Sequence, residues 1–280
     1  MSTPLTLDDR QRAMLLEMGV RVWLPGTAFD TVSAEAPKPA QFTEPAPVAV
    51  PAVTPAPAPA PRSVSASEPA LRSTPPAGEL DWAGLADAAA ACQACGLCAG
   101  RKNATLRAAA QPQADWMVVG DPPDEDEDRA ARPFVEAPGL LLDNMLKAVG
   151  ASRSVTTGDA AHAAYATNVV KCRPPHGRNP QPADLAQCAR FLQNEIALVR
   201  PKVILAMGRF AIQTLLSEHG ALATQPLGKL RGGVYYHCGV PVVVTYHPQL
   251  LLRNSADKAK AWADLCLAMD AIAAPPSPAA

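Results

Sequence analysis

A proline- and alanine-rich stretch separates the parts of this chain that are able to fold. Twelve of the 30 prolines fall between Pro37 and Pro76, where large apolar side chains are few. Such a segment cannot bury enough surface to offset the entropy lost on ordering, and its prolines favour an extended polyproline II linker. We therefore divide the chain into four expected segments. They are a short helical N-terminal piece (1–30), a disordered linker (31–79), one folded domain (80–273) and a disordered tail (274–280).

Within the expected domain, short β-branched runs alternate with longer segments of helical periodicity. The expected strands are Trp116–Val119, Tyr165–Val170, Val203–Met207 and a hairpin pair, Val234–Tyr236 with Val240–Tyr246. The expected helices are Leu140–Val149, Ala183–Val199, Gly208–Ser217 and a last helix capped by Ser255 and ending at Ile272. Continuous apolar strands between helices are typical of a parallel sheet covered on both faces. The sequence therefore predicts an α/β fold, a three-layer α/β/α sandwich with a mainly parallel central sheet.

Polar residues follow several of these strands. Gly120–Asp124 comes after the first strand, Asn168 lies in the second, and His247 follows the last. Ligands of open α/β sheets bind beyond the carboxyl ends of the strands, so these segments are expected to converge on one site. The alternative is that they are ordinary loops of the fold.

The spacing of the cysteines suits a metal centre. Cys92 and Cys95 form a C-x-x-C pair, and Cys172 and Cys188 lie far downstream. One close pair with two distant cysteines suits a cubane iron–sulfur cluster or a structural zinc ion, whereas buried thiols are the alternative. Cys98 extends the pattern to C-x-x-C-x-x-C and is a rival ligand.

Charge and hydropathy exclude some classes of protein. The net charge is −1, so any contact with nucleic acid requires a local basic patch rather than a global field. The N-terminal sequence lacks the regions of a signal peptide, and no apolar run is long enough to span a membrane. We expect a cytoplasmic, monomeric protein without membrane association, in which Cys238 and Cys266 are core thiols.

Several segments, in order, resemble the iron–sulfur (family 4) uracil-DNA glycosylases across Ala91–Leu267. They are Cys92-x-x-Cys95-x-Leu97 with Arg101, Arg132–Val135, Gly139–Asp143, Thr167–Pro175, Pro201–Ile204, Gly228–Gly232 and Thr245–Pro248. The resemblance implies the uracil-DNA-glycosylase-like fold and an enzyme of base-excision repair. Such an enzyme extrudes uracil from DNA and hydrolyses its N-glycosidic bond.

The resemblance also assigns the cysteines. Cys92, Cys95, Cys172 and Cys188 match the ligands of a [4Fe–4S] cluster, whereas Cys98 matches a non-ligand position. The implied role of the cluster is structural.

The same resemblance implies roles for the strand-end residues. Asn168 matches the residue whose amide pairs with uracil O4 and N3–H, and Phe134 matches the ring on which the base stacks. Glu127 matches a carboxylate that closes off the 5-position of the base and so discriminates against thymine. His247 matches the histidine that stabilises negative charge on the leaving uracil.

Contacts with the rest of the DNA are implied by position. Leu250–Arg253 correspond to the loop that fills the space left by the flipped base. The candidate phosphate contacts are Lys171, Arg173, Arg231 and Arg253, each of which is alternatively a solvated surface charge.

The first motif departs from the family pattern. The family usually reads G-E-A-P-G where this chain has Gly120-Asp121-Pro122-Pro123-Asp124. The candidate catalytic Asp121 is one methylene shorter than glutamate, and Pro122 lacks the N–H that the family offers to uracil O2. The acidic run Asp124–Asp128 would repel phosphate, and Glu136 replaces a usual glycine. Altered specificity and lost catalysis are both consistent with these changes.

The N-terminal piece carries a second, shorter resemblance. Asp8–Pro25 reads as an amphipathic helix followed by a segment containing Trp23, similar to the N-terminal peptide of the psi subunit of the DNA polymerase III clamp loader. A generic partner-binding peptide is the alternative. Two hypotheses follow: a uracil-DNA glycosylase acting on uracil-containing DNA, or a catalytically impaired adaptor that joins clamp-loader subunits through residues 8–25.

Overall fold

The computed structural model describes residues 80–106, 113–154 and 160–274. The predicted N-terminal piece (1–30) with its candidate partner segment, the predicted linker (31–79) and the last six residues of the predicted tail lie outside the described residues. Among the described residues, no helix combines the length and the apolar character that crossing a membrane requires.

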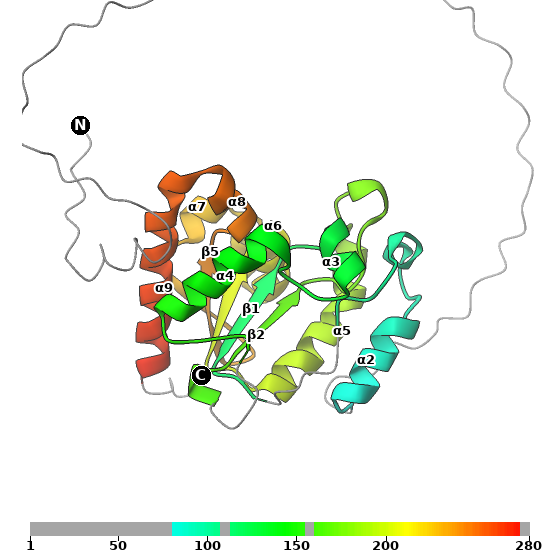
Figure 1. The fold of residues 1–280 in the computed structure, drawn as a ribbon, viewed down its shortest axis with the longest axis horizontal. Coiled ribbons are helices and arrows are strands. Elements are labelled where there is room, and N and C mark those ends of the chain that lie inside the picture. The colour runs from blue at the N-terminus through cyan, green and yellow to red at the C-terminus, as the bar shows by residue number, and fades with distance from the viewer. Residues whose placement is uncertain (1–79, 107–112, 155–159, 275–280) are drawn as a thin grey trace, which may run out of the picture. The chain divides into compact units, whose positions relative to one another are not determined.

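A five-stranded sheet lies at the centre of the described domain (Figure 1). The strands β1 (Trp116–Gly120), β2 (Ala164–Asn168), β3 (Val203–Met207) and β5 (Val240–Thr245) pair in parallel. β4 (Val234–His237) pairs antiparallel with β5 and forms one edge, in the order β2-β1-β3-β5-β4. The predicted mainly parallel sheet with a terminal hairpin is confirmed.

Helices cover both faces of the sheet. One face packs against α2 (Trp82–Ala91), α5 (Pro182–Val199) and α6 (Arg209–Leu215), and the other against α4 (Glu136–Ala148), α8 (Pro248–Arg253) and α9 (Lys258–Ala273). The side chains of β1 alternate between the two cores, with Met117 and Val119 in the first and Trp116 and Val118 in the second. The predicted three-layer α/β/α sandwich is confirmed.

Short helices and 3₁₀ turns (labelled η) connect these layers. They are α3 (Glu125–Ala130), α7 (Leu227–Leu230), η1 (Gly96–Gly100), η2 (Ala160–His162), η3 (Pro175–Gly177), η4 (Ser217–Thr224) and η5 (Ser255–Asp257).

Two helix starts differ from the prediction. α4 begins at Glu136 rather than Leu140, because Pro138 is tolerated in the first turn, where backbone N–H groups have no intrahelical partner. The predicted cap at Ser255 is wrong: this residue opens the η5 turn, and the N-cap of α9 is Asp257.

Two further predictions need correction. The predicted strand Tyr165–Val170 ends at Asn168, because the chain leaves the sheet there. Cys238 does not lie in the core; it is exposed in the turn between β4 and β5 and has a positive φ of 48°. Cys266 is partly buried on α9.

Candidate active site and cysteine-lined cavity

The carboxyl ends of the strands bring the predicted strand-end residues together. Gly120 and Asn168 are register partners at the ends of β1 and β2, and His247 follows β5. A Cβ atom on Gly120 would lie 2.5 Å from the Phe134 ring and 3.4 Å from His247 Nε2. The Phe134 and His247 rings stack with their centroids 5.2 Å apart. The glycine at the end of β1 therefore leaves room for the Phe134 ring, and these groups form one site.

Asn168 is buried, and its amide is held in one orientation. Nδ2 donates to the backbone carbonyl of Asp121 at 3.0 Å and approaches the two carboxylate oxygens of Glu127 at 3.4 and 3.3 Å. Within the described part of the chain, no donor reaches Oδ1, which is also shielded from solvent. Because a buried acceptor without a partner is costly, Asn168 offers an oxygen that a ligand N–H can satisfy.

Glu127 connects α3 to the segment that carries Phe134. Its carboxylate accepts the backbone N–H groups of Asp124 and Phe134, and Asp124 in turn caps the helix by accepting the Glu127 N–H. Asp128 is also buried and accepts backbone N–H groups from the loop at Lys102. Three residues of the acidic run, Asp124, Glu127 and Asp128, therefore accept hydrogen bonds within the fold. Sequence reasoning missed α3, although the spacing of Asp124 and Glu127 is that of a capping box.

Burial gives Glu127 an unusual titration. It raises the pKa of this carboxyl from 4.5 to about 7, although the two backbone N–H donors oppose the shift. A carboxyl whose pKa is raised on folding stabilises the folded state below its unfolded pKa, and this contribution is lost as the pH rises through the folded pKa. Glu127 therefore loses its stabilising contribution over the pH window from 4.5 to about 7.

A glutamine at position 127 is expected to remove this pH dependence. The free energy of unfolding of the wild type, relative to Glu127→Gln, should fall by on the order of 3 kcal/mol as the pH rises through that window. Urea unfolding of both proteins at about pH 5 and about pH 8 measures the change. A difference between the two proteins that stays constant across this range would contradict the burial of a titrating carboxyl.

The segment around Phe134 has an unusual backbone. Phe134 and Glu136 have φ values of 51° and 52°, in the left-handed region that favours glycine, which explains why a glycine suits position 136 in the family pattern. Gly139 lets α4 approach this segment, because a Cβ atom there would overlap the Phe134 carbonyl. Arg153, which sequence reasoning missed, donates to that carbonyl at 3.1 Å and pairs with Asp143. The surrounding structure thus fixes the ring in place.

His247 is positioned by the start of α8. As the N-cap residue it accepts the Gln249 backbone N–H at Nδ1, 3.3 Å away. Burial lowers the pKa of the imidazole to about 4, so the ring is neutral near pH 7. With Nδ1 as the acceptor, we assign the ring proton to Nε2, the nitrogen beside Gly120. The site therefore contains a neutral N–H donor.

Asp121 caps α6. Its Oδ1 accepts the Phe210 backbone N–H at 2.8 Å, and Gly208, with a φ of 107°, leaves room for the carboxylate. Burial raises the pKa of Asp121, while the N–H groups at the start of α6 oppose the rise. The candidate catalytic carboxylate therefore has a structural task, and the neighbouring Pro122 has no N–H to offer.

Four cysteines line one small cavity. Cys92 and Cys95 follow α2, Cys172 lies in the loop after β2, and Cys188 lies on α5. All four are free. Cys98 is not among the described residues that line this cavity, although it belongs to the same cysteine run. The structure thus groups the four cysteines that the family resemblance selects.

Hydrogen bonds support the sulfur atoms around this cavity. Arg101 donates to Cys172 Sγ at 3.0 Å and to the carbonyl of Ala89 at the end of α2, and the Lys171 backbone N–H donates to Cys188 Sγ at 3.3 Å. Burial raises the pKa of the Cys172 thiol to about 11 and that of Cys188 to about 12. In the described ranges, no three His, Cys, Asp or Glu side chains are placed to hold a single metal ion.

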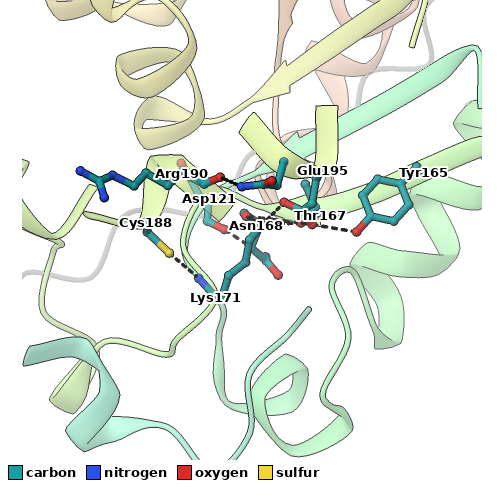
Figure 2. Close-up of polar contacts among 9 residues, drawn as sticks. Asp121, Tyr165, Thr167, Asn168, Lys171, Cys188, Arg190 and Glu195 are labelled. Carbon is teal, nitrogen blue, oxygen red and sulfur yellow. Dashed lines mark hydrogen bonds and ion pairs between the residues drawn. The ribbon is translucent and has the colours of Figure 1, made fainter. Parts of the chain in front are cut away.

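The prediction that Lys171 contacts phosphate is wrong. Its side chain is 2% exposed and forms an ion pair with the fully buried Glu195 (Figure 2). Sequence reasoning missed Glu195 together with its partners Tyr165 and Thr167. The signal was present, since Glu195 lies two helical turns after Cys188, on the stripe of α5 that faces the core.

The other three basic candidates differ in their ion pairs and in their exposure to solvent. Arg231 donates to both carboxylate oxygens of Asp264, at 2.7 and 2.9 Å, and so holds α9 instead of presenting its charge to solvent. As a phosphate contact it is not supported. Arg173 is partly exposed beside Glu125, and Arg253 is exposed on α8. For these two residues the predicted phosphate contact stays a prediction.

Comparison with known proteins shows the family of this chain. The sequence profile of the family described as the Uracil DNA glycosylase superfamily matches residues 108–266. The Type-4 uracil-DNA glycosylase of Pyrobaculum aerophilum is 36% identical over 180 residues, which cover 63% of this chain and 87% of that protein. The Type-4 uracil-DNA glycosylase of Thermotoga maritima is 35% identical over 170 residues, 60% of this chain and 81% of the relative. That of Sulfurisphaera tokodaii is 35% identical over 166 residues, 58% and 72% respectively.

Proposed function

The chain belongs to the uracil-DNA glycosylase superfamily, and from this premise we propose that it hydrolyses the N-glycosidic bond of flipped-out uracil in DNA. The observation that carries the proposal is the amide of Asn168, buried at the end of β2 with an unpaired Oδ1. The proposed setting is base-excision repair by a monomer in the cytoplasm. The substrate is uracil-containing DNA.

Asn168 is proposed to read the edge of the base. Uracil presents an O4 acceptor beside an N3–H donor, whereas cytosine presents an amino donor beside an N3 acceptor. The unpaired Oδ1 accepts the N3–H group. Nδ2 donates to O4 with the hydrogen that faces Glu127, because its contact with Glu127 is longer than its bond to the Asp121 carbonyl. The bond from Nδ2 to the Asp121 carbonyl keeps the amide from turning over, so the pattern of cytosine is rejected.

Phe134 and His247 are proposed to hold and release the base. The base stacks on the Phe134 ring, and the Nε2–H of His247 donates to O2. As the bond from the sugar carbon to N1 breaks, its electron pair moves into the uracil ring, and water supplies the new oxygen on the sugar. Because Pro122 cannot donate an N–H at this place, stabilisation of the charge on O2 depends strongly on His247.

Glu127 and Asp121 are proposed to complete the pocket. Glu127 is fixed by the N–H groups of Asp124 and Phe134, and we assign it the exclusion of the thymine methyl group. Asp121 is held by the start of α6 and places a carboxylate near the sugar, where it favours positive charge.

The four cysteines are proposed to hold a [4Fe–4S] cluster. The donor set fits this group: Cys92, Cys95, Cys172 and Cys188 surround one cavity, and two of the sulfurs already accept N–H donors that would stabilise thiolates. When bound, the cluster supplies a structural cross-link. These residues then join α2, the loop after β2 and α5.

The test is excision from a defined oligonucleotide. Purified protein is mixed in excess with duplexes that carry one uracil, one thymine or one cytosine at the same place, and alkali then cleaves abasic sites. We expect product from uracil alone. Absence of product under these single-turnover conditions, with iron present in the protein, would refute the enzyme and leave the second candidate.

The second candidate is the impaired adaptor, favoured by one observation: Asp121 is engaged by α6 and is followed by a proline. In that case DNA binding is retained without excision, and clamp-loader subunits bind through residues 8–25. Loss of that binding on Trp23→Ala, in a pull-down with purified clamp-loader subunits, would support the proposed contact, and an unchanged signal would refute it. The excision assay separates the adaptor from the enzyme.

A further inference from the structure

A buried ion pair between Lys171 and Glu195 contacts the backbone of Asn168, the residue proposed to read the base. Figure 2 shows Lys171, from the loop after β2, reaching toward Glu195 on α5. The side chains are 2% and 0% exposed, and Lys171 is among the largest side chains that the interior encloses. Replacing such a pair by apolar residues of similar volume is often neutral or stabilising, so its presence calls for a specific reason.

The ammonium group of Lys171 uses all three of its hydrogen atoms. Nζ donates to Glu195 Oε2, to Thr167 Oγ1 at 2.7 Å and to the backbone carbonyl of Asn168 at 2.7 Å. The second carboxylate oxygen, Glu195 Oε1, accepts the hydroxyl groups of Tyr165 and Thr167, each at 2.7 Å. The network is therefore complete, and one of its three arms ends on Asn168.

Lys171 is fixed to α5 at both ends of the residue. Its backbone N–H donates to Cys188 Sγ, and its ammonium binds Glu195 two helical turns further along the same helix. A side chain anchored in this way has little freedom to move relative to α5. The position of the Asn168 carbonyl is thus defined against a rigid element rather than by the loop alone.

We propose that Lys171 is a positioning residue that fixes Asn168 for base recognition by donating from its ammonium group to the Asn168 carbonyl. The inference rests on the proposed function, because it takes Asn168 as the residue that reads uracil. What an apolar side chain of similar length cannot supply is this donor. The role of Glu195 is to pair with the ammonium group and to aim it at the Asn168 carbonyl.

The test compares three variants of the full chain. Lys171→Met removes the donor at similar volume, and Lys171→Met/Glu195→Gln also removes the buried charge that would otherwise be left unpaired. Lys202→Met is the matched control, because Lys202 is an exposed lysine paired with Asp115 just before β3, at the opposite end of the strands. The readouts are kcat/KM on a uracil duplex, the thermal midpoint, and Kd for two uncleavable duplexes. One carries 2′-fluoro-deoxyuridine and the other a tetrahydrofuran abasic site.

We expect kcat/KM to fall about 10- to 100-fold in both Lys171 variants, as for a misplaced recognition group. Their preference for the fluoro-uridine duplex over the abasic duplex should be lost, while Kd for the abasic duplex stays at the wild-type value. The double variant should regain thermal stability relative to Lys171→Met without regaining this preference. Lys202→Met should match the wild type in every readout.

Recovery of both stability and base preference in the double variant would overturn the inference, because the pair would then be only structural. So would a wild-type base preference in Lys171→Met. Failure of the proposed function looks different, since the wild-type protein itself would then neither excise uracil nor prefer the fluoro-uridine duplex.

Discussion

Replacing His247 by alanine is expected to lower the rate of uracil excision about 100- to 1,000-fold, the usual cost of removing a donor aimed at developing negative charge. The effect should lie in kcat, because the leaving base carries its charge only as the bond breaks. Position 122, in the loop after β1, cannot compensate, since proline has no N–H. Single-turnover excision from a uracil duplex measures the rate.

His247→Gln is the informative companion variant. A glutamine amide places an N–H near the position of Nε2, so part of the rate should return, whereas binding of an abasic duplex should be the same in both variants. Because burial lowers the pKa of the imidazole to about 4, the wild-type rate should show no titration of His247 between about pH 6 and about pH 8. An alanine variant with the wild-type rate would contradict the assignment of His247 to the leaving base.

The layers of the fold were predictable because their signal is local. Val203–Met207 is a continuous apolar run between Pro201-Lys202 and Gly208, and it forms β3 with the predicted bounds. Alternating runs of this kind imply parallel strands, and parallel strands place their carboxyl ends at one edge. For this reason Asn168 and His247 could be placed at one site from the sequence alone.

What the sequence did not reveal depends on partners distant in the chain. Lys171 follows a strand in a basic context and resembles a phosphate contact, and only its approach to Glu195, far along α5, shows that it is buried. Asp121 likewise reads as a free carboxylate until α6 is placed against it. In both cases a charged group was assigned to solvent or substrate because its protein partner is not a sequence neighbour.

The fold tolerates the altered first motif because its changed residues have partners within the structure. Asp121 is short, but it reaches the start of α6, where Gly208 has no side chain to obstruct it. Asp124 replaces a usual glycine and becomes the cap of α3. Asp121 and Asp124 therefore support local structure. The change expected to weaken catalysis is Pro122, which has no backbone N–H to donate to the leaving base.

Replacing Cys188 by alanine is expected to have the largest effect on stability. The proposed cluster requires all four thiolates. Its loss should leave the end of α2, which precedes Cys92 and Cys95, held to this region by the bonds of Arg101 to Ala89 and Cys172 without the cross-link. Loss of a structural metal centre is among the few changes that cost more than about 4 kcal/mol. Iron per chain, visible absorbance and the urea midpoint, all measured on anaerobically purified protein, should fall together.

Cys98→Ala is the matched control, because it removes the same atom from a partly buried cysteine of the same run that does not line the cavity in the described structure. It should keep full iron content and cost about 1 kcal/mol, the typical effect of a single substitution. If Cys98→Ala loses iron while Cys188→Ala keeps it, the ligand set is wrong. If the wild type itself contains no iron, the cluster is refuted, and the cavity between α2 and α5 holds only buried thiols.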